Sequence, residues 1–127
     1  MKLIPYLFFN GDCREAITRY RDVLGLRLSD IMAYGETPCD EGGPLPVEWR
    51  DKVMHASLEQ DDGEVLLMAS DGMPDKPLHG ERQHVAIGID DLARARQIFD
   101  ALAEGGDVKM PFGPTFWAQG YGMLTDR

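Results

Sequence analysis

The sequence has few cysteines, few basic side chains and no long apolar run. Of its 127 residues, 13 are Lys or Arg and 22 are Asp or Glu, which gives a formal net charge of −9. Because nucleic-acid binding needs a basic surface, no nucleic-acid partner is expected. No apolar run approaches the length of a membrane span, and the N-terminus lacks the hydrophobic region of a signal peptide. We therefore expect a cytoplasmic protein with no membrane association.

The two cysteines, Cys13 and Cys39, do not have the spacing of a metal site. We expect both thiols to stay reduced, as is usual in a cytoplasm. A chain of 127 residues suits a single domain that can bury a core of its own. We therefore expect one domain over residues 1–127 that depends on neither a disulfide nor a structural metal.

An internal repeat is the most informative pattern in the chain. Each copy reads as a strand, a turn and an amphipathic helix that ends at glycine. Ala16 and Tyr20 of the first copy correspond to Ala95 and Phe99 of the second, 79 positions later. Such a repeat constrains the architecture more than any single residue does. We expect module one at about residues 1–72 and module two at about residues 82–127, with the paired modules building a shared cleft.

Apolar spacing and turn residues predict the elements of module one. A helix is expected over residues 12–24, capped by Asp12 and ended by Gly25 in a left-handed conformation. Asp61-Asp62-Gly63 predicts a hairpin turn, and the continuous apolar run after it predicts a strand buried on both faces. The expected strands cover residues 3–9, 26–32, 53–58 and 65–69.

Module two is expected to open with a strand over residues 84–89. A helix follows over residues 91–103, with Asp90 or Asp91 as its cap. Further strands are expected to start at residues 108–110 and 122–125. The side chains predicted to be buried beneath the two helices are Ile17, Tyr20, Leu24, Ile98, Phe99 and Leu102.

Several segments along the whole chain together resemble one known family. They are Pro5-Tyr-Leu-Phe-Phe-Asn-Gly11, Tyr20 with Val23-Leu-Gly25, Asp51-Lys-Val-Met-His-Ala56, Leu67-Met-Ala-Ser-Asp-Gly72, Asp90-Asp91, and Phe116-Trp-Ala118 followed by Tyr121-Gly-Met-Leu-Thr-Asp126. This set resembles the PhnB-like branch of the glyoxalase, bleomycin-resistance and extradiol-dioxygenase superfamily, which has the vicinal oxygen chelate fold. Proteins of this branch often carry a methyltransferase name, but this sequence has no glycine-rich cofactor loop of that kind.

The resemblance implies an α+β fold in which two βαβββ modules form a curved, mostly antiparallel eight-stranded sheet around a cleft. In the branch, a further Trp-containing strand follows the position of Asp126-Arg127, so we expect that last strand to be missing from this chain. Members of the superfamily usually form dimers. A homodimer that takes a small-molecule ligand is therefore expected.

The resemblance also implies four metal-ligand positions, of which this sequence fills one. Pro5 stands at the first position and cannot coordinate, whereas His84 stands at the second and can. The third position falls at Leu67 or Met68, neither of which suits a hard metal, and the fourth lies beyond this sequence. We therefore expect no cofactor. If a divalent metal binds, we expect His84 with His55 to hold it, with an oxygen from Glu59 or Glu64 as a further ligand.

Aromatic residues offer a second kind of site. Phe112, Phe116, Trp117 and Tyr121, with Tyr6, Phe8 and Trp49, are expected either to line an apolar cleft that stacks a flat ligand or to fill the core and the dimer interface. The ligand-binding candidates from both lines of argument are His55, Met68, His84, Phe116, Trp117 and Tyr121.

Three hypotheses for the function stay open at this point. The first is a metal-free protein that binds a small molecule, as bleomycin-resistance proteins do. The second is a metal-dependent lyase, isomerase or dioxygenase acting on a small oxygenated substrate, and the third is a dimeric interaction module. The fold cannot decide among them, since one fold hosts many chemistries.

Overall fold

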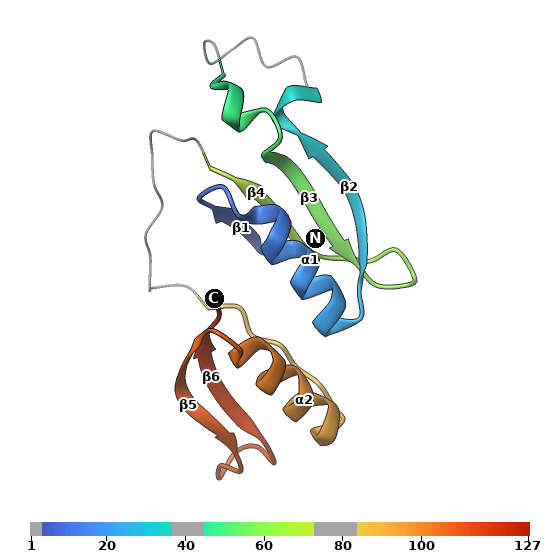
Figure 1. Cartoon of the computed structure of the whole chain (residues 1–127). Helices are drawn as coiled ribbons and strands as arrows, with labels where there is room; N and C mark the ends of the chain where they lie inside the picture. Colours follow the sequence, from blue (N-terminus) through green and yellow to red (C-terminus); the bar gives the residue numbers. More distant parts are fainter. Residues whose placement is uncertain (1–3, 37–44, 73–83) are drawn as a thin grey trace. The chain divides into compact units, whose positions relative to one another are not determined.

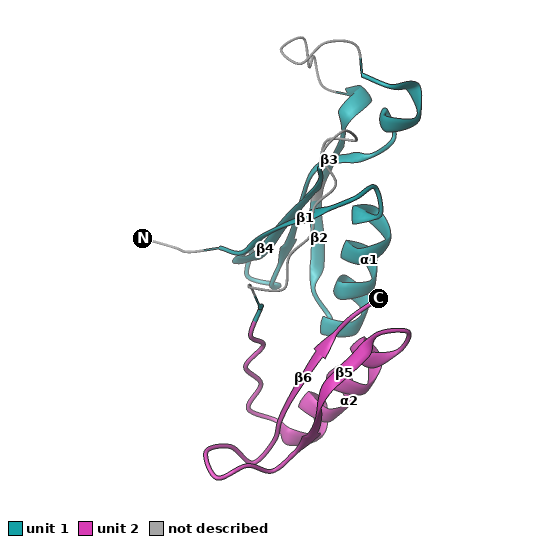
Figure 2. Cartoon of the chain, turned by 90° about the vertical axis from the view of Figure 1, so that its left-hand side faces the viewer, with its two compact units in different colours: residues 1–85 teal, residues 86–127 magenta. Residues whose placement is uncertain are grey.

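The computed structural model describes residues 4–36, 45–72 and 84–127. The chain forms two compact units, unit 1 over Met1–Val85 and unit 2 over Ala86–Arg127 (Figures 1 and 2). Cys39 and His79 lie outside the described residues. The helices of the described ranges are too short and too polar to cross a membrane.

Unit 1 has the element order of one βαβββ module. Strand β1 (Tyr6–Phe9) leads into helix α1 (Cys13–Leu24), which is followed by β2 (Arg27–Ala33), β3 (Val53–Glu59) and β4 (Val65–Asp71). The four strands form one sheet in the order β1-β4-β3-β2 (Figure 1). The β1–β4 pair is parallel, and the β4–β3 and β3–β2 pairs are antiparallel. Two short 3-10 helices, Tyr34–Glu36 and Val47–Trp49, lie between β2 and β3.

Helix α1 covers one face of this sheet (Figure 2). Its residues Cys13 and Ile17 are fully buried against Val53, Ala56 and Leu58 of β3. Burial of an aliphatic side chain such as Ile17 contributes about 1.5–3 kcal/mol. Gly25 ends the helix at φ 70° and ψ 40°, the left-handed conformation predicted from the sequence. The core of unit 1 therefore lies between α1 and the sheet.

The N-terminus of α1 is held by a carboxylate from β4. We predicted Asp12 as the cap, but its side chain makes no capping hydrogen bond, and its backbone (φ −115°, ψ 14°) lies outside the extended region typical of a cap. Asp71 Oδ1 accepts instead from the backbone N–H groups of Gly11 and Cys13, both at 2.9 Å. Asp71 Oδ2 accepts from Val53 N at 2.8 Å. Asp12 thus occupies the predicted N-cap position, but a distant side chain makes the capping hydrogen bonds in its place.

Unit 2 consists of α2 (Leu92–Ala103), β5 (Asp107–Gly113) and β6 (Tyr121–Thr125). Asp91 caps α2 as predicted, since its Oδ1 accepts from Arg94 N at 2.8 Å. β5 and β6 pair antiparallel as a separate two-stranded sheet. The expected strand over residues 84–89 is not formed, and the described residues form six strands in two sheets, without the eight-stranded sheet. The apolar pattern of residues 84–89 is strand-like, but no strand among the described residues pairs with this segment.

Burial agrees with the predicted helix stripes in part. Ile17, Ile98 and Leu102 are buried, whereas Tyr20, Leu24 and Phe99 are only half-buried. The sequence predicts that the strand after the hairpin is buried on both faces, but only one face of β4 is buried in the core. In β4 only Leu67 and Ala69 join the core beneath α1, while Leu66 is exposed on the other face.

Candidate functional site

The face of the unit 1 sheet that α1 leaves uncovered carries a continuous set of functional side chains. Leu7 and Phe9 pack into the core beneath α1, so the alternating residues Tyr6 and Phe8 point to the other side. The strand register places further side chains on the same side, because directly paired residues share a face. We call this surface the open face; it comprises Tyr6, Phe8, Arg27, Ser29, Met32, His55, Ser57, Glu59, Leu66, Met68 and Ser70.

The β1 side of the open face is aromatic. The rings of Tyr6 and Phe8 stack with centroids 4.9 Å apart and an interplanar angle of 28°. The two side chains are nevertheless 40% and 57% exposed, so they are available to a ligand. Met68 lies directly beside Tyr6 in the β1–β4 register and is half-buried. This arrangement offers ring faces and a polarisable thioether as an apolar contact surface.

A phenol and an imidazole meet at the edge of this aromatic group. Tyr6 Oη lies 3.1 Å from His55 Nδ1, and the two ring centroids are 5.9 Å apart. His55 is half-buried and pairs in register with Met32 of β2. Which atom donates depends on the tautomer of His55. In either tautomer the pair adds a hydrogen-bonding group to the aromatic side of the open face.

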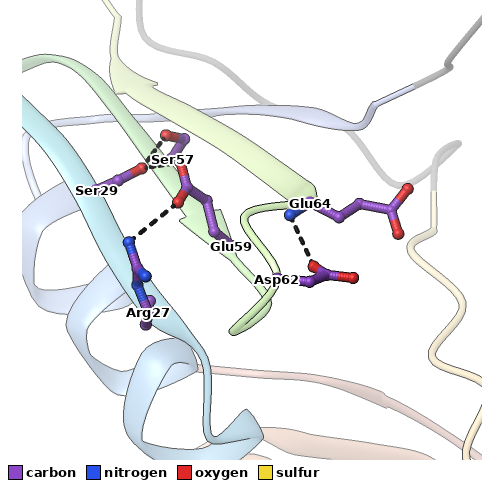
Figure 3. Close-up of polar contacts among 6 residues, drawn as sticks. All are labelled: Arg27, Ser29, Ser57, Glu59, Asp62 and Glu64. Atoms are coloured by element: carbon purple, nitrogen blue, oxygen red, sulfur yellow. Dashed lines mark hydrogen bonds and ion pairs between the residues drawn. The ribbon is translucent and has the colours of Figure 1, made fainter.

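The β2–β3 side of the open face is polar (Figure 3). Ser29 Oγ lies 2.8 Å from Ser57 Oγ and donates to Glu59 Oε1 at 2.5 Å. Arg27 Nη2 is 3.6 Å from Glu59 Oε2. Ser57 is buried, and the Glu59 side chain is 16% exposed. The face therefore changes from aromatic to hydrogen-bonding across the four strands.

The structure brings only some of the predicted site residues together. His55 and Met68 lie on the open face, on adjacent strands. His84 is exposed and lies outside any helix or strand. Phe116, Trp117 and Tyr121 belong to unit 2 and form a group of their own. The predicted set is thus divided between two surfaces, with His84 on neither of them.

The unit 2 group is an exposed aromatic cluster at the β5–β6 connection. Trp117 makes edge-to-face contacts with Phe116 at 4.6 Å and with Tyr121 at 5.5 Å between ring centroids. Thr115 and Ala118 close the turn, since the Thr115 N–H donates to the Ala118 carbonyl at 2.9 Å. Phe116 is 97% exposed. In contrast, Phe112 packs against Phe99 of α2 with ring centroids 5.5 Å apart.

The resemblance implies a divalent-metal site, and the donor side chains of the described residues bear on it. A catalytic metal such as zinc takes three protein ligands and keeps one position open. Within residues 4–36, 45–72 and 84–127, no three His, Cys, Asp or Glu side chains gather closely enough to hold a metal ion. His55 has Tyr6 and Met32 as its neighbours on the open face. Within the described residues, no single unit therefore holds a ready-made metal site.

Sequence reasoning missed the serine pair of the open face. Ser29 and Ser57 were not among the candidates, and Glu59 was considered only as a metal ligand. The alternation within β3 places His55, Ser57 and Glu59 on one face and was a usable signal. The pairing with Ser29 was not available from that alternation, because the alternation within one strand does not fix its register against another strand.

Comparison with known proteins gives a consistent family. The Glyoxalase/Bleomycin resistance protein/Dioxygenase superfamily matches residues 2–127. Protein YjdN of Escherichia coli strain K12 is 30% identical over 133 residues, covering 100% of this chain and 89% of YjdN. Protein PA1353 from Pseudomonas aeruginosa, which has a crystal structure, is 44% identical to this chain in sequence. The two structures match with a TM-score of 0.85, and the match covers 100% of this chain and 90% of that one.

A further solved structure supports the fold alone. It is described as the putative 3-demethylubiquinone-9 3-methyltransferase, PhnB protein, from Bacillus cereus. It is 23% identical with a TM-score of 0.67, and the match covers 99% of this chain and 92% of that chain. The family model and the relative that is 30% identical confirm the superfamily that the sequence segments resemble.

Proposed function

We propose that this chain, which belongs to the Glyoxalase/Bleomycin resistance protein/Dioxygenase superfamily, binds a small, flat organic molecule on the open face of unit 1. The observation that carries the proposal is the exposed stack of Tyr6 and Phe8 beside the Tyr6–His55 hydrogen bond. The protein acts in this proposal by holding its ligand, and no chemical step is assigned to it.

The uneven burial of the sheet supports this choice of surface. Leu7 and Phe9 on the α1 side contribute to the core, whereas Tyr6 and Phe8 on the other side remain exposed. Exposed apolar patches on a protein surface mark sites of interaction more often than chance. Ring faces at such a site favour planar ligands, because offset-stacked rings attract one another beyond their buried area.

The Tyr6–His55 pair supports a ligand with polar substituents. Ligand sites are mostly apolar, with a few polar groups that fix the orientation of the bound molecule. The Tyr6 hydroxyl and the Nε2 atom of the His55 ring provide such groups directly beside the stack. A flat molecule that carries a hydroxyl, carbonyl or amine suits this combination.

A fluorescent probe tests the binding proposal. The uncharged naphthalene dye 6-propionyl-2-(dimethylamino)naphthalene is titrated with the full chain, and its emission shifts to the blue when it enters an apolar site. We expect saturable binding that Tyr6→Ala and Phe8→Ala each weaken about fivefold, since each variant loses stacking worth about 1 kcal/mol.

Two further variants serve as comparisons. Val47→Ala removes a side chain that is 74% exposed and lies in a 3-10 helix away from the open face, so it should leave the titration unchanged. Phe116→Ala removes the most exposed aromatic ring of unit 2. If Phe116→Ala weakens the dye and Tyr6→Ala does not, the ligand binds the unit 2 cluster and the proposal for the open face is wrong.

The proposal includes a homodimer. Superfamily members are commonly dimeric, and both units of this chain expose aromatic side chains, including Phe8 and Trp117. Light scattering coupled to size-exclusion chromatography measures the mass directly. A mass near 28 kDa is expected, twice the 14.2 kDa of one chain. A mass of one chain at micromolar concentration would contradict the dimer and leave the ligand proposal in place.

A further inference from the structure

One row of the open face crosses all four strands of unit 1. Tyr6 of β1 pairs in register with Met68 of β4, Met68 pairs with Ser57 of β3, and Ser57 pairs with Ser29 of β2. Neighbouring strands lie about 4.8 Å apart, so the row is about 14 Å long. It begins with an aromatic ring and ends with two hydroxyl groups. A molecule of two fused rings lying over Tyr6 and Met68 covers the apolar half of this row, and a short substituent on it extends toward Ser57.

The hydrogen bonds at the polar end run in one direction. A serine hydroxyl has a single proton, and Ser29 gives its proton to Glu59 Oε1. The short Ser29–Ser57 contact must then use the proton of Ser57. Both serine protons are therefore committed within the chain Ser57→Ser29→Glu59. What Ser57 Oγ and the Glu59 carboxylate still offer to a ligand is lone pairs.

The Arg27–Glu59 ion pair does not close this acceptor site. Arg27 is 58% exposed and its Nη2 is 3.6 Å from Glu59 Oε2, and exposed pairs of this kind contribute little free energy. A carboxylate can accept about four hydrogen bonds. The Ser29 bond and the Arg27 contact leave part of that capacity for another donor.

We infer that the polar end of the row selects ligands carrying a hydrogen-bond donor, above all a protonated amine, through Ser57 Oγ and Glu59. This inference rests on the proposed function, because the ring of the same ligand lies on Tyr6 and Met68. The charge of the chain agrees with it, since a net charge of −9 favours cationic over anionic ligands in the surrounding field. Glu59 is then the specificity-determining residue, and the aromatic rings provide affinity.

Four matched naphthalene probes separate the two contributions. They are 2-methylnaphthalene, 2-naphthylmethanol, 2-naphthylmethylammonium and 2-naphthoate, and each is titrated into the full chain. We expect the ammonium probe to bind most tightly and naphthoate most weakly. Glu59→Gln should weaken the ammonium probe about tenfold, since hydrogen bonds to charged groups are the strong ones, and should change methylnaphthalene less than about twofold.

Glu64→Gln is the matched control. It removes the same charge from the turn that follows β3, where the Glu64 side chain extends away from the Ser29–Ser57–Glu59 group (Figure 3). A general effect of net charge would weaken the ammonium probe equally in both variants. Such equality, or naphthoate binding as tightly as the ammonium probe, would overturn the inference.

Ser57→Ala provides a second, independent variant should Glu59→Gln fail to fold. It removes an acceptor and leaves the carboxylate, so it should weaken the alcohol and ammonium probes several-fold relative to methylnaphthalene. An unchanged ratio among the probes in this variant would also contradict the inference. If none of the four probes binds the unsubstituted chain, the proposed function itself fails, and that outcome is distinct from a failure of donor selection.

Discussion

The carboxylate of Asp71 accepts the backbone N–H of Cys13 at 2.9 Å, although 58 positions separate the two residues. The same carboxylate also accepts from Gly11 N and Val53 N, and the Asp71 carbonyl accepts from the Tyr34 hydroxyl at 2.7 Å. Asp71 is 1% exposed, so these bonds replace water almost completely. The end of β4 thereby fixes the turn before α1 and the start of β3.

Asp71→Asn should destabilise the chain strongly. An amide places an N–H₂ group where a carboxylate oxygen accepted a backbone N–H, which leaves a buried donor facing a donor. We expect the free energy of unfolding to fall by about 2–4 kcal/mol, as measured by urea denaturation followed by circular dichroism.

Asp62→Asn is the control for this prediction. Asp62 Oδ1 accepts a single backbone N–H, from Glu64 at 2.9 Å, in an exposed turn. We expect this variant to lose less than about 1 kcal/mol, because water replaces a lost bond at the surface. Equal losses in the two variants would show that Asp71 is not the centre of the turn network.

Cys13 connects the same region to a pH-dependent stability. Burial, followed by the nearby charges of Asp71 and Asp12, raises the pKa of the Cys13 thiol to about 12. In the unfolded chain the thiol titrates from an ordinary value near 9.0, so between these two values the unfolded state binds fewer protons than the folded state. The Cys13 contribution is thus complete below pH 9 and is lost as the pH rises toward 12.

Urea denaturation between pH 8 and pH 11 measures this loss in the full chain and in Cys13→Ala. We expect the free energy of unfolding of the full chain to fall more steeply, by up to about 1.4 kcal/mol per pH unit above pH 9. Tyrosine and lysine titrations are common to both chains and cancel in the difference. Parallel pH profiles would contradict a buried, protonated thiol at position 13.

Local sequence signals predicted where the helices of this chain end better than they predicted which strands pair with one another. Gly25 and Asp91 were identified correctly because each acts on its own helix end. Asp12 occupies the predicted N-cap position, but Asp71, at the far end of β4, makes the side-chain hydrogen bonds to that turn. The strand predicted over residues 84–89 was wrong. An apolar pattern indicates the periodicity of a strand, but it does not show which other strand would pair with the segment.

The candidate site was likewise predicted only in part, because local signals identify residues but not their partners on other strands. His55 was predicted from its residue type, and Tyr6 was considered with the other aromatic residues. Their hydrogen bond depends on bringing β1 beside β4 and β4 beside β3, which the sequence alone does not give. Ser29 and Ser57 come into contact through the register of β2 against β3, so the residue spacing within either strand does not predict their hydrogen bond.

Gly122 of β6 should tolerate no side chain. A Cβ atom there would lie 2.6 Å from Phe99 Cε2 and 3.1 Å from Phe112 Cα, inside the contact between α2 and the β5–β6 pair. Gly122→Ala must therefore displace the Phe99 ring, and we expect a loss of about 1–3 kcal/mol in the stability of unit 2. Hydrogen exchange of the α2 amides measures that loss locally.

Gly113→Ala serves as the comparison for Gly122→Ala. Gly113 lies in β5, and an added Cβ meets nothing within 4 Å. We expect unchanged or slightly increased protection of α2 in this variant, since replacing glycine reduces the entropy of the unfolded chain. A similar loss of protection in both variants would indicate a backbone effect instead of a collision with Phe99.

The last prediction concerns metal, and it decides between the binding protein and the metal-dependent enzyme. His55 Nδ1 is engaged with Tyr6, and the described residues offer no group of three ligands, so we expect no strong metal binding. We expect untagged protein to contain less than stoichiometric Zn, Mn, Ni or Co, and its melting temperature to stay unchanged when these ions are added. A metal that binds the native state at a hundred times its dissociation constant would add about 2.7 kcal/mol of stability, so real binding is easily seen. One metal ion per chain, lost in both His84→Ala and His55→Ala, would contradict this expectation and make lyase, isomerase and dioxygenase assays the next step.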